Sequence, residues 1–183
     1  MKPISVPTAE QVSPLAQELF QQLKKKIGKV PNLYATMGYS EKALKGFLDL
    51  DTTLSGGIFT PKEREAIALV VSEVNGCEYC LAAHTLSALR TGHSREETLA
   101  IREGHATDPK LSALVTLAKS VAENKGHVPD APLEAFFAAG YDEAALMDLV
   151  GLIAVRVFTN YVYALTHIPL DFPAAPSLHQ TKN

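Results

Sequence analysis

The chain has 183 residues, of which 46% are hydrophobic and 20% charged, values typical of a soluble globular protein and not of a disordered or fibrous one. Its formal net charge is −3, so it lacks the basic field that nucleic-acid binding requires. The N-terminal residues lack the apolar stretch of a signal peptide. We therefore expect a single domain over residues 1–183, in the cytoplasm, with neither a nucleic-acid nor a membrane partner.

Helical spacing of apolar residues runs through nearly the whole chain, and no run alternates over the length of a strand, which predicts an all-α fold. The clearest start signal is Thr60-Pro61-Lys62-Glu63, with a capping Thr, a Pro at the first helical position and a Glu that closes a capping box. We expect helices from Thr8 or Ser13 to Gly28, a short one from Pro31, then from Ser40 to Ser55, Thr60 to Asn75, Cys77 to Thr91, Ser94 to Arg102, Asp108 to Asn124, Pro132 to Ala139 and Asp142 to His167.

The last of these helices contains the most membrane-like segment of the chain, residues 149–165. Arg156 and Asn160 lie near its middle, and a central Arg costs roughly 2.5–3.5 kcal/mol on membrane-insertion scales. We interpret the segment as a buried helix at a subunit contact. Arg156 and Asn160 share a face, which favours a role as buried polar partners over a catalytic one.

The C-terminal tail, residues 169–183, contains three prolines and no periodic pattern. Such a segment has no apolar face to bury as a helix or strand. We expect an extended arm or a loose end.

Cys77 and Cys80 are the only two cysteines, and His84 follows four residues after the second. On a helix these offsets place all three side chains on one face. Cys77 would lie in the first turn, where free N–H groups and the helix dipole favour a thiolate, the form that attacks a peroxide or a disulfide. His84 can hydrogen-bond Cys80 or relay its proton. The pattern predicts a thiol–disulfide redox centre.

Three other interpretations of the cysteine pair are less favoured. Two small cysteines can simply pack in a helical core, because free Cys is often buried. Structural zinc normally requires four ligands, commonly as two separated pairs, and only one pair is present, so we expect no metal. A thioredoxin fold places its CxxC after a strand, in an α/β pattern that this chain lacks.

Glu65 is the next candidate, twelve positions before Cys77 and beside the apolar run 66–71. A partly desolvated carboxylate there would have a raised pKa and could act as a base. Alternatively, Glu65 only supplies negative charge to the first helical turn, as Glu63 does. The residues alone leave both interpretations open.

The spacing Glu65, eleven residues, Cys77, two residues, Cys80, three residues, His84 resembles that of the AhpD-like alkylhydroperoxidases of the carboxymuconolactone decarboxylase superfamily. The core motif spans residues 63–91, and within it the string from 71 to 84 is similar to the peroxidase-related branch. The resemblance implies an AhpD-like helical bundle that assembles as a homotrimer or homohexamer. It also argues against lactone decarboxylation, because the decarboxylase branch is not built around this cysteine pair.

Carried over by position, the resemblance implies that Cys80 is the peroxidatic cysteine and Cys77 the resolving one. His84 and Glu65 would form the proton relay. The implied activity is an alkylhydroperoxidase-type oxidoreductase in antioxidant defence, which reduces organic hydroperoxides through a Cys77–Cys80 disulfide. No cofactor is implied beyond this disulfide and an external dithiol or thioredoxin-like reductant.

The chain departs from the family at Tyr79, where well-studied members have a second His. A phenol with a pKa near 10 cannot shuttle protons at neutral pH as imidazole does. Tyr79 could instead orient a substrate or a water molecule, or pack. The departure motivates an alternative function, a dithiol redox relay or sensing adaptor with weak peroxidase activity. A third possible function is that of a non-redox scaffold.

Overall fold

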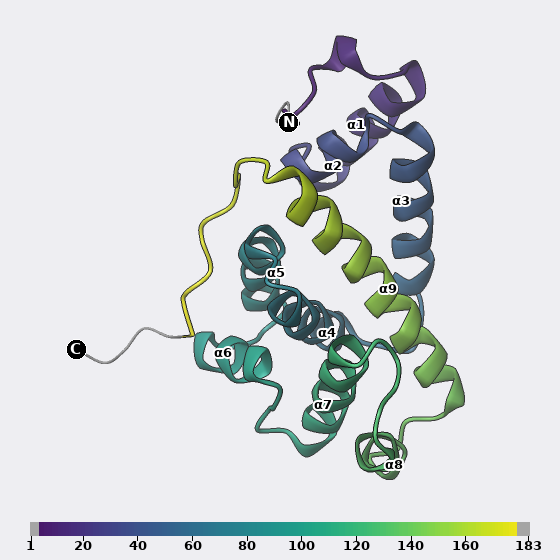
Figure 1. Cartoon of the computed structure of the whole chain (residues 1–183), viewed down its shortest axis with the longest axis vertical. Coiled ribbons are helices and arrows are strands. Elements are labelled where there is room, and N and C mark those ends of the chain that lie inside the picture. Colours follow the sequence, from purple (N-terminus) through teal and green to yellow (C-terminus); the bar gives the residue numbers. More distant parts are fainter. Residues whose placement is uncertain (1–3, 179–183) are drawn as a thin grey trace, which may run out of the picture.

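The computed structural model describes residues 4–178, which form nine α-helices, one short 3-10 helix and no strand. The expected all-α fold is therefore confirmed for this part of the chain (Figure 1). In chain order the elements are η1 (Ala9–Gln11), α1 (Pro14–Ile27), α2 (Asn32–Met37), α3 (Glu41–Ser55), α4 (Pro61–Val74), α5 (Glu78–Arg90), α6 (Arg95–Glu103), α7 (Pro109–Glu123), α8 (Asp130–Ala138) and α9 (Glu143–Thr166).

The helix boundaries follow the capping residues closely. Ser13 caps α1 by accepting a hydrogen bond from the backbone N–H of Ala16, which decides between the two expected starts. Thr60 and Glu63 form the expected capping box at the start of α4. The largest difference is at α8, which begins at Asp130, two residues before the expected Pro132.

Helix α4 is the centre of the molecule and packs against α5, α6, α7 and α9 (Figure 1). Its residues from Ala66 to Ser72 are all buried, as expected for a segment that is almost apolar on every side. Because α4 carries Glu65 and leads directly into α5, its burial fixes one wall of the region around the cysteines.

Helix α9 crosses the molecule between α3 and the α4–α5 pair and contacts all three (Figure 1). Two clusters of buried side chains lie along it. One surrounds α4, α7 and the first half of α9. The other joins α1–α3 to Cys77, Tyr79 and Cys80, so the two thiols lie in a hydrophobic core.

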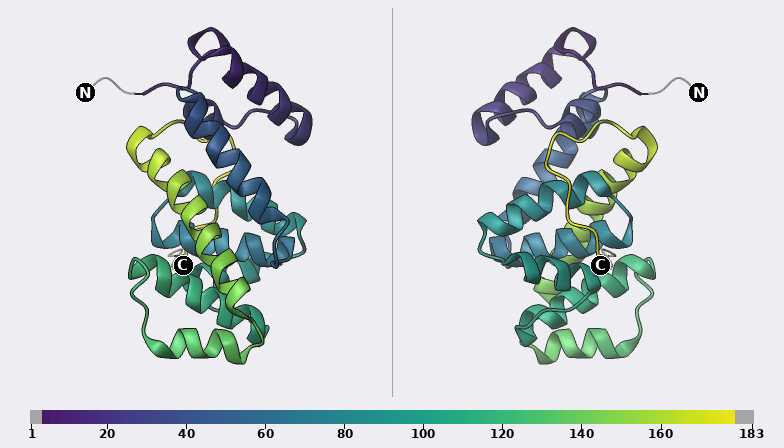
Figure 2. Two further views of the ribbon diagram at one scale, coloured as in Figure 1. Left: turned by 90° about the vertical axis from the view of Figure 1, so that its right-hand side faces the viewer. Right: turned by 90° about the vertical axis from the view of Figure 1, so that its left-hand side faces the viewer.

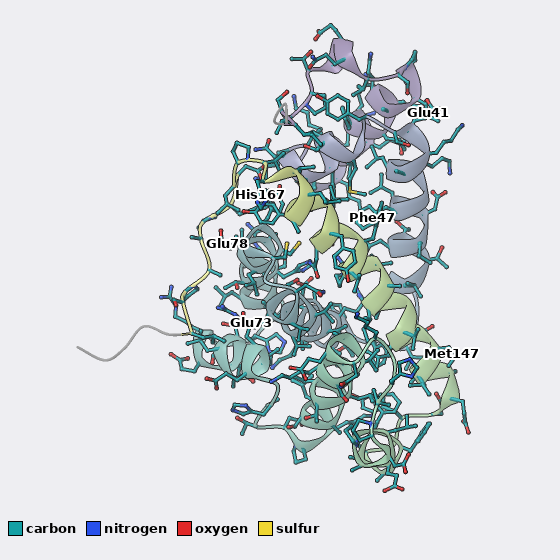
Figure 3. The ribbon with its side chains drawn as sticks, viewed as in Figure 1. Glu41, Phe47, Glu73, Glu78, Met147 and His167 are labelled. Carbon is teal, nitrogen blue, oxygen red and sulfur yellow. The ribbon has the colours of Figure 1, made fainter. Side chains whose placement is uncertain are left out.

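The expected burial of α9 is correct for one face only. By length and composition this helix could cross a membrane, and 39% of its apolar window is buried within the structure. Phe158 contacts Phe47 of α3, which lies between the two helices (Figure 3). Met147, Tyr161 and Leu165 are exposed, with Met147 on the outer side of the helix (Figure 3). The subunit contact expected for this helix would have to use that outer face.

Of the two expectations for the tail, residues 169–178 show the extended arm, and it is anchored at both ends; residues 179–183 lie outside the described part of the chain. It runs back toward α6 (Figure 2), where Arg102 donates a hydrogen bond to the carbonyl of Pro176 at 2.6 Å. Near its start, Lys29 forms an ion pair with Asp171 at 3.0 Å and lies 3.7 Å from the centre of the Phe172 ring.

We expect Leu149→Ala to lower the free energy of unfolding by about 2–5 kcal/mol, because the Leu149 side chain is 0% exposed and its loss leaves a cavity. The neighbouring Val150 is 46% exposed, so Val150→Ala should change stability by less than about 1 kcal/mol. Urea unfolding of the two variants measures both values. Equal losses would show that α9 does not present these faces as described.

Candidate active site

The two cysteines meet because α5 begins between them. Gly76 adopts a left-handed conformation, with φ of 61°, that turns the chain from α4 into α5. Cys77 is the N-cap of α5, and its Sγ accepts a hydrogen bond from the backbone N–H of Cys80 at 3.2 Å. Both side chains are free thiols, with Cys77 1% and Cys80 3% exposed. The local geometry therefore brings two reduced sulfurs together away from bulk water.

The surroundings of the thiols favour negative charge on Cys80. A hydrogen bond from the Cys77 thiol, with the charge of a protonated His84 and hydrogen bonds from Asn160 and Thr159, outweighs burial and lowers the pKa of Cys80 to about 7. The pKa of Cys77 is raised strongly, because its thiol donates to Cys80 and is buried. The hydrogen bond from the backbone N–H of Cys80 to Cys77 Sγ lowers the pKa of Cys77, but the two raising effects outweigh it. The attacking form is thus favoured at Cys80.

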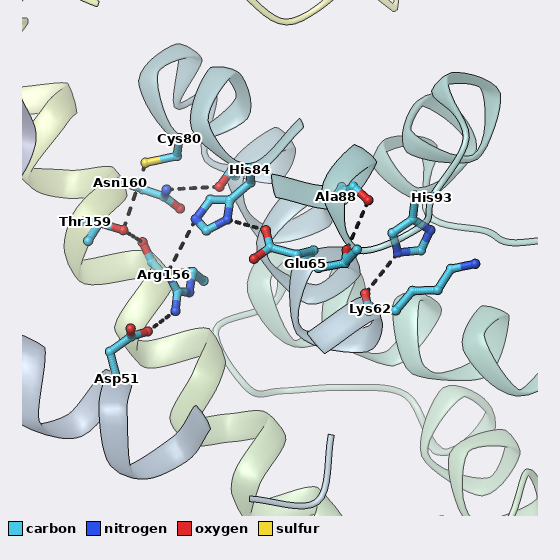
Figure 4. A network of polar contacts seen from close by, with 12 residues as sticks. Asp51, Lys62, Glu65, Cys80, His84, Ala88, His93, Arg156, Thr159 and Asn160 are labelled. Carbon is cyan, nitrogen blue, oxygen red and sulfur yellow. Dashed lines mark hydrogen bonds and ion pairs between the residues drawn. The ribbon is translucent and has the colours of Figure 1, made fainter. Parts of the chain in front are cut away.

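His84 and Glu65 form a direct contact between α5 and α4, 2.8 Å between Nδ1 and Oε2 (Figure 4). Burial raises the pKa of Glu65, but the charge and hydrogen bond of His84, with the nearby Arg156 and Arg64, outweigh it and hold the pKa below its usual range. The raised pKa expected for Glu65 is therefore wrong. Glu65 remains a carboxylate that orients His84 and does not act as a near-neutral base.

Arg156 is a site residue that the sequence interpretation placed in a structural role. Its Nη1 lies 3.4 Å from Nε2 of His84, and its Nη2 forms an ion pair with Asp51 of α3 (Figure 4). A guanidinium only donates, so His84 carries its proton on Nδ1, toward Glu65, and keeps a lone pair on Nε2. The sequence contained a signal for this role, because Arg156 is a charged residue in the middle of an apolar helix.

Asn160 does not pair with Arg156 as expected. Its side-chain oxygen accepts a hydrogen bond from Asn75 Nδ2 at 2.9 Å, and its Nδ2 donates to Ser72 Oγ at 3.3 Å. These bonds hold the end of α4 against α9. Asn160 also contributes to the low pKa of Cys80, so it supports the thiols from behind.

A small cavity of about 50 Å³ lies beside Cys80. Because one water molecule needs roughly 10–15 Å³ of such volume, the cavity has room for a peroxide group but not for a whole organic molecule. A larger cleft of about 690 Å³ adjoins it and shares several of its residues. The residues common to both are Pro31, Tyr34, Ala83, His84, Arg156 and Phe172.

Tyr79 is a buried tether between three parts of the chain. Its hydroxyl accepts a hydrogen bond from the backbone N–H of Leu33 at 3.2 Å and donates one to Asp171 Oδ1 at 2.5 Å. Phe172 packs edge-on against its ring. Burial, and then the bond to Asp171, raise the pKa of the phenol. Tyr79 thus remains protonated and holds α2 and the tail beside the thiols; of the roles considered for it, packing is the one that these contacts support.

His93, in the loop between α5 and α6, lies apart from this group. Its Nε2 donates to the carbonyl of Lys62 at 2.9 Å, and its side chain is fully buried (Figure 4). Over residues 4–178 no group of three or more His, Cys, Asp or Glu side chains could hold a metal ion.

Several solved structures share this fold. A peroxidase-related protein with an alkylhydroperoxidase AhpD core, from Ralstonia eutropha JMP134, is 22% identical, with 93% of this chain and 94% of that chain covered and a TM-score of 0.81. A peroxidase-related protein from Silicibacter sp. TM1040 is 22% identical over 98% and 97%, with a TM-score of 0.76. A cysteine-to-alanine variant of the debrominase Bmp8, in complex with 2,3,4-tribromopyrrole, is 20% identical over 93% and 92%, with a TM-score of 0.78.

These likenesses define the fold as AhpD-like. In addition, residues 41–107 match the model of the Carboxymuconolactone decarboxylase family. The family match covers residues 41–107, which include Glu65, Cys77, Cys80 and His84, and together with the AhpD-like fold it agrees with the resemblance drawn from the cysteine motif. No curated protein matches the chain at a significant level.

The thiolate of Cys80 should appear as pH rises through about 7, whereas Cys77 should ionise only far above the ordinary range of a thiol. Ultraviolet thiolate absorbance, followed against pH in the parent and in Cys77→Ser and Cys80→Ser variants, measures both. Because the protonated imidazole stabilises the thiolate, His84→Gln should move the Cys80 transition to higher pH. An unchanged transition in His84→Gln would refute the electrostatic role of His84.

We expect Tyr79→Phe to lower the free energy of unfolding by about 1–3 kcal/mol, because it leaves a buried N–H of Leu33 and the carboxylate of Asp171 without their shared partner. Tyr161, which is 56% exposed, provides the matched control. Tyr161→Phe should change stability by less than about 0.5 kcal/mol. Chemical denaturation of both variants tests the difference.

Proposed function

We propose that this protein is a thiol-dependent peroxidase that reduces organic hydroperoxides. The observation that carries the proposal is the unequal thiol pair: Cys80 has a pKa near neutrality and lines a cavity of peroxide size, whereas Cys77 remains protonated beside it. A nucleophilic thiolate with a protonated thiol within reach is what a two-cysteine peroxide cycle requires.

The cycle uses groups that are already in contact or share the cavity. Nε2 of His84 takes the proton of the Cys80 thiol, and the thiolate then attacks the terminal oxygen of the hydroperoxide. The O–O bond breaks, Cys80 becomes a sulfenic acid, and the alkoxide leaves as an alcohol after it takes the proton back from His84. The Cys77 thiol condenses with the sulfenic acid, which releases water and forms the disulfide.

The disulfide is the whole redox cofactor of this cycle. An external dithiol or thioredoxin-like protein supplies two electrons and two protons to restore the thiols. The cytoplasm, expected from the sequence, keeps such reductants available. In the proposed cycle Nε2 exchanges its contact with Arg156 for the Cys80 proton while Glu65 holds Nδ1, and no second histidine is used at the position of Tyr79.

A dithiol relay or sensing adaptor with weak peroxidase activity is the second candidate. It is favoured by the phenol of Tyr79, whose raised pKa prevents proton transfer at neutral pH. The peroxide rate constant and the disulfide reduction potential, measured together, separate the two functions. A rate no better than that of a free thiol, with rapid exchange against a partner disulfide, would favour the relay. A bromopyrrole, suggested by the debrominase neighbour, serves as an alternative substrate in the same assay.

Self-association as a homotrimer or homohexamer is part of the proposal. The outer face of α9 carries large exposed apolar side chains, among them Met147, Tyr161 and Leu165, the last 79% exposed. Large apolar side chains exposed along one helix face are expected at a protein interface. Light scattering coupled to size exclusion determines the subunit number, and Leu165→Glu should reduce it.

The proposed cycle predicts that Cys80→Ser abolishes peroxide consumption with a dithiol reductant. Without added reductant, Cys77→Ser should consume one equivalent of hydroperoxide and keep the sulfenic acid on Cys80, because no second thiol is present to condense with it. Intact-mass spectrometry should show one added oxygen in Cys77→Ser and a loss of two hydrogens in the parent. If Cys80→Ser consumes peroxide as fast as the parent, the proposed function fails.

A further inference from the structure

The large cleft adjoins the small cavity beside Cys80 (the inner cavity), and it can hold the organic part of a substrate. At about 690 Å³ it falls within the size range of small-molecule sites, whereas the inner cavity of about 50 Å³ holds only a peroxide group. The cleft lies among α1, α3, α4, α5, α9 and the start of the tail, and it reaches from His84 to Arg90 at the end of α5. A substrate whose peroxide group reaches Cys80 must leave its remaining atoms in this cleft.

The charges that line the cleft are not balanced. Its carboxylates already have cationic or imidazole partners, whereas Arg64 and Arg90 have no carboxylate within ion-pair distance among residues 4–178. Arg64 is half-buried and donates from Nη1 to the carbonyl of Phe59 at 2.7 Å, and Arg90 is exposed. The three paired carboxylates are Asp51 with Arg156, Glu65 with His84, and Asp171 with Lys29.

Between the thiol and the free arginine at the end of α5, the cleft is partly apolar. Ile27, Tyr34, Leu86 and Phe172 line it. Arg90 lies ten positions after Cys80 on α5, which is roughly 15 Å along the helix axis at the rise of an α-helix. A ligand that spans the cleft would therefore have a reactive group at one end, an apolar chain in the middle and an anionic group at the other end.

We propose that Arg64 and Arg90 select hydroperoxides of long-chain carboxylic acids, with the carboxylate at the arginines, the chain in the cleft and the hydroperoxide at Cys80. The inference rests on the proposed peroxidase function and names its substrate class. Guanidinium groups bind carboxylates through charge-assisted, often bidentate hydrogen bonds, which gives both orientation and selectivity. An uncharged ester of the same chain lacks this contact.

The test compares one long-chain hydroperoxy acid with its methyl ester. The parent should have kcat/KM for the acid on the order of tenfold above that for the ester, through a lower KM. In the double variant Arg64→Gln/Arg90→Gln the ratio should fall to about one. Arg95→Gln, which removes an exposed arginine of α6 outside the cleft, should keep the ratio of the parent.

Binding without chemistry separates this proposal from the peroxidase function. Titration calorimetry with the corresponding hydroxy acid, which has no O–O bond, should show binding by the parent and by Arg95→Gln and weak or no binding by the double variant. That result with no hydroperoxide reduction would overturn the peroxidase function and keep the carboxylate site. Equal ratios in parent and double variant, or equal binding, would overturn the site, and a loss of stability without a change in ratio would assign the two arginines to structure.

Discussion

The chemistry of this protein depends on how the start of α5 brings the thiols of Cys77 and Cys80 together inside a hydrophobic core. Cys77 caps the helix and Cys80 lies one turn later, so the Cys77 thiol is placed to donate a hydrogen bond to Cys80, which lowers the pKa of Cys80. Burial alone would raise the pKa of both thiols. The bond makes them unequal: the donor, Cys77, keeps its proton, and the acceptor, Cys80, gains a stabilised negative charge. In the proposed cycle, attack and resolution therefore fall to different sulfurs.

Around this bond, four helices contribute one charged group each to a chain of contacts. Asp51 of α3 pairs with Arg156 of α9, which faces His84 of α5, which contacts Glu65 of α4. Each group forms a hydrogen bond or an ion pair with the next. Polar groups that would be costly to bury singly are therefore held together at the wall of the cavity. His84 is fixed from both sides, because Nδ1 donates to Glu65 and the lone pair on Nε2 accepts from the guanidinium.

The tail and Tyr79 close the site on the other side. Asp171 accepts from the phenol of Tyr79 and pairs with Lys29, and Phe172 lines both the inner cavity and the cleft. The residue that departs from the family pattern is therefore part of the wall. Its hydroxyl links α2, α5 and the tail through hydrogen bonds to Leu33 and Asp171. An imidazole has a different shape and could not place its polar atoms where the phenol oxygen lies.

Sequence by itself determined the helices, the cysteine–histidine face and the resemblance to a family. Helical periodicity and caps such as Thr60 act over a few residues, and so does the spacing of Cys77, Cys80 and His84. The low pKa of Glu65, the place of Arg156 and Asp51 beside His84, and the anchoring of Asp171 needed the tertiary structure. These features join residues 19 to 142 positions apart, and charges at such separations interact only after packing has brought them together.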